Sequence, residues 1–204
     1  MANLPPAPSI KIRLARAQLG AALHLFIRNK DPYSVHALAC GGSELIEGLA
    51  ETAGLQTLSN HIMALQPDID MRKIKGLRNQ YWNALKHFYK HTGETARDDE
   101  RLMADFSDVA NDAVLFMGWL DYLMLAKRLP VEVQVFQVWW YATNESRMNP
   151  KTDPEPWRAV FPGIAAQERE EQKRRLRRTV ERYRKDMAIL ADPATELGPL
   201  LIAL

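Results

Sequence analysis

The stretch AVLFMGWLDYLML, residues 113–125, is the most apolar long run in this chain of 204 residues. Apolar side chains occupy nearly every side of a helix drawn through it, a pattern typical of a helix that packs against several neighbours. The run contains Asp121 and is well short of the roughly 20 apolar residues needed to span a bilayer. We therefore expect it to form the central helix of a folded core and not to enter a membrane.

Helical patterns also lie on both sides of this run. Asp31 followed by Pro32 is a strong N-cap and first-turn pair, and Gly93 is a candidate left-handed end for another helix. Apolar residues recur at helical spacing through residues 9–30, 31–52, 55–65, 71–93 and 99–128. These segments predict a helical bundle.

Residues 131–143, VEVQVFQVWWYAT, fit two structures. Val131, Val133 and Val135 alternate with polar residues as in a strand, but a lone strand would have no partner, and no second convincing strand is found. We interpret the segment as a helix, with a strand over residues 131–141 as the alternative. The predicted fold class is all-α, an up-and-down bundle of four or five long helices with an additional charged C-terminal helix.

Three regions follow from these patterns. Residues 9–146 are the bundle, residues 147–163 are a proline-rich connection with one helical turn around Trp157, and residues 164–204 are a charged helix and an apolar tail. Residues 169–185 contain nine Lys or Arg and three Glu. The last region is expected to pack on the bundle or to project as an arm, either as a phosphate-binding surface or as a solvated, salt-bridged helix.

Composition places few limits on function. A formal net charge of +2 is too small to indicate nucleic-acid binding, so any such argument depends on local charge. Cys40 is the only cysteine, which excludes an intramolecular disulfide and a cysteine-rich metal site. The first residues lack the pattern of a secretory signal peptide. We expect a cytoplasmic protein without membrane association.

Residues 71–93, MRKIKGLRNQYWNALKHFYKHTG, have the strongest amphipathic pattern in the chain. One predicted face is apolar and contains Ile74, Leu77, Tyr81, Ala84, Leu85 and Phe88. The opposite face is a polar stripe composed of Arg72, Lys75, Asn79, Asn83, Lys86 and Lys90. Asparagine lowers helix propensity, so Asn79 and Asn83 indicate hydrogen-bonding partners in the fold or in a ligand. The alternative is an ordinary solvated helix face.

Within LRNQYWNALKH, Arg78 is followed by the polar Asn79 and, farther along the predicted helix, by His87. This arrangement resembles the motif of the HEPN superfamily of small all-helical bacterial nucleases, in which Arg and a polar residue precede a His by four to six intervening positions. The resemblance covers the middle third of the chain. It departs from the family pattern because Asn83 stands at the expected His position and His87 lies one turn farther on.

The resemblance implies a metal-independent ribonuclease in which Arg78 and His87 are catalytic. The His would move the proton of the ribose 2′-hydroxyl, and the Arg would stabilise the charged phosphorane, without a cofactor. The two side chains lie about 180° apart on the predicted helix, so a homodimer would be needed to bring two copies together. Substrate RNA would be bound by Asn79, Asn83, Lys86 and Lys90. HEPN nucleases are often toxins of toxin–antitoxin or phage-defence systems, which implies a bacterial stress or defence role.

Three residues of other helices are expected to support this site, namely His36, Glu44 and Asp112. No metal is predicted, because His36 and the nearby Cys40 are only two ligands on one helix. A buried aspartate needs a partner, and Asp112 is expected to meet Lys86 or His87. His87 is accordingly expected to be partly buried beside Glu44 or Asp112, where a carboxylate raises its pKa.

Two classes of function stay open. The first is an HEPN-like protein that binds RNA or cleaves it without a metal. The second is a non-enzymatic helical interaction protein, dimeric or bound to a partner protein, in which the polar stripe only holds helices together. Exposure distinguishes the two classes: a recognition stripe must open into a cleft, whereas a structural one is paired with Glu44, Glu47 or Asp112.

Overall fold

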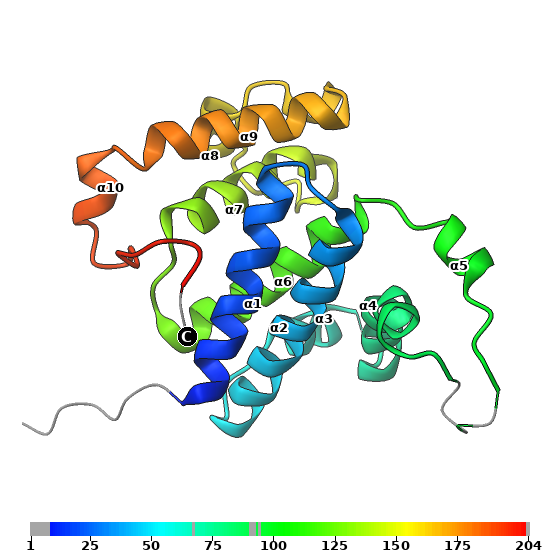
Figure 1. The fold of residues 1–204 in the computed structure, drawn as a ribbon. Coiled ribbons are helices and arrows are strands. Elements are labelled where there is room, and N and C mark those ends of the chain that lie inside the picture. The colour runs from blue at the N-terminus through cyan, green and yellow to red at the C-terminus, as the bar shows by residue number, and fades with distance from the viewer. Residues whose placement is uncertain (1–8, 67, 90–92, 94, 203–204) are drawn as a thin grey trace, which may run out of the picture.

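The computed structural model describes residues 9–66, 68–89, 93 and 95–202. Across these residues the chain forms ten α-helices, two short 3-10 helices and no strand, which confirms the predicted all-α fold (Figure 1). The α-helices are α1 (Ile10–Ile27), α2 (Pro32–Thr52), α3 (Leu58–Leu65), α4 (Met71–Lys86), α5 (Glu100–Ala104), α6 (Ala110–Ala126), α7 (Val131–Thr143), α8 (Glu155–Val160), α9 (Arg169–Tyr183) and α10 (Met187–Ala191). No helix within the described ranges is long and apolar enough to cross a membrane.

Local signals set several helix boundaries as predicted. The Ser9 side chain caps α1 by accepting a hydrogen bond from the N–H three residues later. The Asp31 carboxylate accepts bonds from two backbone N–H groups where Pro32 begins α2. Residues 131–143 form α7, so the helical interpretation is confirmed and the strand alternative is wrong.

The helix predicted over residues 71–93 is shorter in the structure. It ends at Lys86, and His87 already has an extended backbone, with φ of −122° and ψ of 121°. Gly93 has a positive φ of 79°, but it lies in the connection beyond this end. The direction of the His87 side chain therefore does not follow from the regular geometry of α4.

Two other predicted helices are divided. Residues 105–109 separate α5 from α6, and within them Phe106 packs against Tyr33 and Tyr81 in an aromatic cluster. The charged helix predicted within residues 164–204 consists of a 3-10 turn (Ile164–Ala166), α9 and α10. A new helix begins after α9 because Asp186 accepts hydrogen bonds from the first N–H groups of α10.

α2 packs against α1, α6 and α4. Figure 1 shows α9 above α7, and α9 contacts both α7 and α1. Leu176 and Val180 of α9 are buried in these contacts. The charged helix α9 therefore packs against α7 and α1.

The segment after α10 returns to α1 and is fixed there by Arg16. This buried guanidinium donates hydrogen bonds to the carbonyl of Leu200 at 2.8 Å and to the Glu196 carboxylate at 2.9 Å. Tyr122 of α6 donates a further bond to Glu196 at 2.9 Å. The side chain of Leu200 is buried, so the apolar tail contacts the bundle at this residue, whereas Leu201 is 46% exposed.

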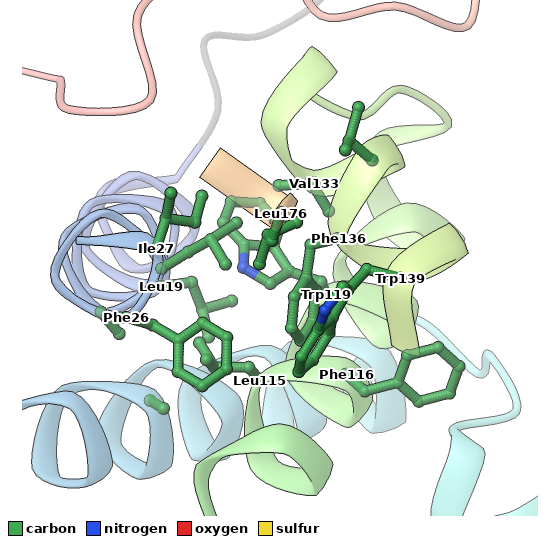
Figure 2. Packing of buried hydrophobic residues seen from close by; sticks show 14 of the residues in the cluster. Leu19, Phe26, Ile27, Leu115, Phe116, Trp119, Val133, Phe136, Trp139 and Leu176 are labelled. Carbon is green, nitrogen blue, oxygen red and sulfur yellow. The ribbon is translucent and has the colours of Figure 1, made fainter. Parts of the chain in front are cut away.

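The main core forms where α1, α6, α7 and α9 meet. Phe26 makes edge-to-face contacts with Phe136 and Trp139, at centroid distances of 5.6 Å and 5.7 Å. Figure 2 shows this cluster beside Trp119 and Leu176, which are both fully buried. Trp119 belongs to the apolar run 113–125, so the run takes the central place that its all-round apolarity predicts.

Two glycines allow α1, α2 and α6 to approach one another closely. A Cβ atom at Gly118 of α6 would lie 2.3 Å from Ser43 Oγ and 2.8 Å from Leu19 Cδ2. A Cβ atom at Gly42 of α2 would lie 2.8 Å from Leu19 Cγ. Leu19 of α1 therefore fits against α2 and α6 because both facing positions lack a side chain.

Gly118→Ala is expected to lower the free energy of unfolding by about 1–3 kcal/mol, because the added methyl group overlaps Leu19 and Ser43. Gly76→Ala in α4 is the matched control, since a Cβ atom there meets nothing within 4 Å. The control is expected to gain about 0.5–1 kcal/mol from the higher helix propensity of alanine. Urea unfolding followed by circular dichroism measures both variants, and equal stabilities would contradict the close helix approach.

Candidate functional site

Arg78, which the sequence places on an RNA-binding stripe, points into the protein. Its side chain is only 5% exposed, and Nη2 donates a 3.1 Å hydrogen bond to Glu47 Oε2 of α2. Its Nε donates to Asn79 Oδ1 at 3.0 Å. Lys75 lies 3.4 Å from the same Glu47 oxygen and 4.0 Å from Glu51 Oε1. The two cations thus hold α4 against α2, whereas Asn79 contacts Arg78 within α4.

α4 turns a different face to the bundle from the predicted one. Ile74 and Arg78 are buried, whereas Leu77 and Phe88 are 63% and 72% exposed. The prediction that both exposed residues belong to a buried apolar face is therefore wrong. For Leu77 the physical reason is Glu47, because a buried carboxylate requires a cationic partner and the orientation of α4 that buries Arg78 supplies one. Phe88 lies beyond the end of α4.

The remaining substrate-binding candidates are spread along α4. Asn83 is partly buried, and its backbone carbonyl accepts the N–H of His87 at 3.1 Å. Lys86 is exposed, and its Nζ lies 3.5 Å from the centre of the Trp82 ring in a cation–π contact. Lys90 lies outside the described residues. The structure does not bring these side chains together with Arg78 around one binding site.

His87 follows the last residue of α4 and is exposed. A surface pocket of about 360 Å³ contains it together with Lys86 and Arg97. The predicted burial of His87 beside Glu44 or Asp112 is wrong. The helix ends before this residue, so its regular geometry does not carry the imidazole toward the neighbouring helices.

The three predicted supporting residues have separate surroundings. His36 is buried, with Nδ1 at 2.9 Å from Asn111 Oδ1, and burial lowers its pKa. Glu44 is exposed on α2, and Asp112 pairs with Arg169 of α9, so the predicted contact of Asp112 with α4 is wrong. Among the described residues, no group of three or more His, Cys, Asp or Glu side chains is arranged to hold a metal ion.

Asp112 belongs to a partly buried ionic cluster that sequence reasoning missed. Arg169 donates to Asp112 at 3.0 Å and to Asp108 at 2.8 Å, and Lys173 Nζ lies 2.6 Å from Asp108. Burial raises the pKa of Asp112 to about 6, and the Arg169 guanidinium opposes this rise. The cluster fastens α9 to α6. In the sequence, the contact of α9 with the bundle is indicated by the helical spacing of Lys173, Leu176 and Val180, which are buried.

A groove of about 840 Å³ lies between α1, α2 and α4, and we call it the α2 groove. Its lining is of mixed charge and includes Lys11 and Gln18 of α1, Glu44, Glu47, Gly48 and Glu51 of α2, and Lys75 and Trp82 of α4. Among the described residues, the Oε1 atoms of Glu47 and Gln18 are buried without a hydrogen-bond partner. Sequence reasoning found the acidic residues of α2 but not the groove, since its walls come from three separate helices.

The chain was compared with known proteins on three levels. No protein-family model matches it. No curated protein and no solved structure matches it either. The HEPN resemblance stays a prediction based on Arg78, Asn79 and His87.

Asp121 of α6 supports the start of α3 from a buried position. It is 5% exposed, and its Oδ1 accepts the N–H of Leu58 at 2.7 Å. Burial raises the pKa of Asp121 from 3.8 to about 6, although the bond from Leu58 opposes this rise. The free energy of unfolding therefore falls as pH rises from about 4 to about 6, because the unfolded chain loses the Asp121 proton at a lower pH than the folded chain. Above this range the loss stays constant.

Asp121→Asn is expected to stabilise the protein at pH 7, since the amide oxygen can still accept the Leu58 bond without carrying a charge. The advantage over the wild type should be small near pH 4, grow as pH rises toward 6 and then level off, because Asp121 is protonated in both states at low pH. Melting temperatures of the two proteins across this range measure the difference. A constant difference at every pH would contradict the raised pKa.

Proposed function

We propose that this protein is a non-catalytic helical interaction protein that binds a partner protein. The observation that carries this proposal is the burial of Arg78 against Glu47 at 3.1 Å. An arginine that stabilises a phosphorane must reach the phosphate, and Arg78 would first have to leave a buried carboxylate. Breaking such a pair costs about 3–5 kcal/mol. Arg78 therefore has a structural role in the contact between α2 and α4.

The position of His87 supports the same proposal. It lies past the end of α4 in an exposed pocket, whereas Arg78 is enclosed two turns earlier. A general base must lie within hydrogen-bond reach of the proton that it removes, while the arginine holds the same phosphate. An enclosed arginine and an exposed histidine do not meet this condition within one copy of the chain.

A single observation favours the RNA-cleaving hypothesis as a second candidate. Lys86, His87 and Arg97 line one surface pocket, and two cations beside an imidazole are suited to contact a phosphate. Arg97, however, already forms a 2.7 Å hydrogen bond with Asp99. This candidate therefore depends on His87 and Lys86 and no longer on Arg78.

Incubation of the purified protein with total RNA in EDTA separates the two functions. The interaction protein is expected to generate no 2′,3′-cyclic phosphate ends, and His87→Ala should match the wild type in stability because His87 is exposed. Cyclic phosphate ends that disappear in the His87→Ala protein would overturn the proposal.

A double-mutant cycle tests the structural role of Arg78. Glu47→Leu should lower the free energy of unfolding by about 3–5 kcal/mol, because it leaves a buried guanidinium unpaired. Arg78→Met should cost less, since Lys75 lies 3.4 Å from Glu47 and still neutralises it. The double variant should recover much of the loss, as apolar replacements of buried ion pairs often do. Urea unfolding measures the cycle, and strictly additive losses would refute the pairing.

A further inference from the structure

We infer that the outer face of α9 binds the phosphate backbone of a nucleic-acid duplex. This inference goes beyond the proposed function, because it concerns a different surface from that of α4 and requires neither Arg78 nor His87. α9 lies at the top of the molecule in Figure 1 and packs on α7 and α1. Leu176 and Val180 on its inner side are buried in these contacts. The bundle therefore holds the opposite side of α9 toward the solvent.

The basic residues of α9 and of the turn after it divide into paired and unpaired ones. Those that pair with carboxylates are Arg169, Lys173, Arg174, Arg175 and Arg184. The others are exposed, and within the described residues their side chains form no ion pair. These others are Arg177, Arg178, Arg182 and Lys185, and we call them the α9 basic face.

The α9 basic face is suited in length and charge to a phosphate backbone. Its successive residues are one, four and three positions apart, so they project on one side of the helix. At 1.5 Å per residue the face is about 12 Å long, and a duplex carries one negative charge per about 1.7 Å of its axis. Between residues 174 and 185, Glu181 is the only acidic residue. Each cation of the face can therefore lie against a phosphate.

The chemistry of the exposed side favours phosphate over other anionic partners. Every fully exposed residue of α9 is charged, so this side presents no large apolar group. The centre of a protein–protein interface is usually apolar or aromatic, and a helix that enters a membrane surface needs exposed apolar side chains. Binding to a phosphate backbone requires neither. Three of the four cations are arginines, whose guanidinium can donate two parallel hydrogen bonds to one phosphate.

The test uses the full chain and a short fluorescein-labelled DNA duplex. DNA lacks the ribose 2′-hydroxyl, so cleavage through that group cannot consume the probe. Fluorescence anisotropy should show saturable binding at low salt. The logarithm of the binding constant should fall against the logarithm of the salt concentration with a slope of roughly −3 to −4, since each phosphate contact contributes about −0.9.

The double variant Arg177→Gln, Arg178→Gln should bind roughly 10-fold more weakly or worse and should make the slope shallower by about 2. Its melting temperature should match that of the wild type, because both side chains are exposed and unpaired within the described residues. The matched control is Arg72→Gln, Lys73→Gln, which removes the same charge from exposed positions of α4, away from α9 in Figure 1. This control should keep the wild-type slope.

Four results would overturn the inference. Two are absence of saturable binding and equal losses in the two double variants, which would indicate attraction by net charge alone. The third is displacement of the duplex by polyglutamate as effective as that by unlabelled duplex, which would indicate an acidic protein. The fourth is tighter binding to vesicles of anionic lipid, for which Met187, 74% exposed and two positions after Lys185, would supply an apolar contact.

An RNA duplex of the same sequence distinguishes the two sources of phosphate. Both duplexes present the chemistry that the inference requires, and the one that binds more tightly identifies the source. The inference and the proposed function fail separately, because they concern different surfaces. RNA cleavage that depends on His87 would remove the proposed function alone, whereas loss of duplex binding would remove only this inference.

Discussion

The structure depends on the close contact of α1, α2 and α6 around Leu19. Gly42 and Gly118 face this leucine, and neither position has space for a methyl group. Once α2 is held between α1 and α6, a third side of α2 is left for α4. That side carries Glu47, so the helix that covers it must present a cation, and Arg78 provides one. The orientation of α4 and the shape of the α2 groove both follow from this sequence of constraints.

The fold was largely predictable from the sequence because local signals determine it. Ser9 and Asp31 cap their helices, Pro32 begins α2, and the run 113–125 is apolar on all sides. The site was less predictable because it depends on pairs distant in the chain. Arg78 and Glu47 are 31 positions apart, and the residue type alone does not tell whether an arginine on an amphipathic helix faces water or a buried acid.

Charged side chains join pairs of helices in two regions of the molecule. One joins α2 to α4 through Glu47, and the other joins α6 to α9 through Asp108, Asp112, Arg169 and Lys173. The second is closed, because cations and carboxylates are matched and Lys173 is enclosed. In the first, Glu47 Oε1 is buried and has no hydrogen-bond partner among the described residues.

The return of residues 196–200 to Arg16 affects how the chain reaches its fold. Arg16 lies in the first helix, yet its hydrogen-bond acceptors lie 180 positions or more farther along the chain. During synthesis α1 therefore emerges with a guanidinium that the finished bundle buries, and its final acceptors do not yet exist. An unpaired buried charge is strongly unfavourable, so α1 cannot settle fully into the core until residue 200 has been made. Completion of the bundle is thus linked by a single arginine to the synthesis of residues 196–200.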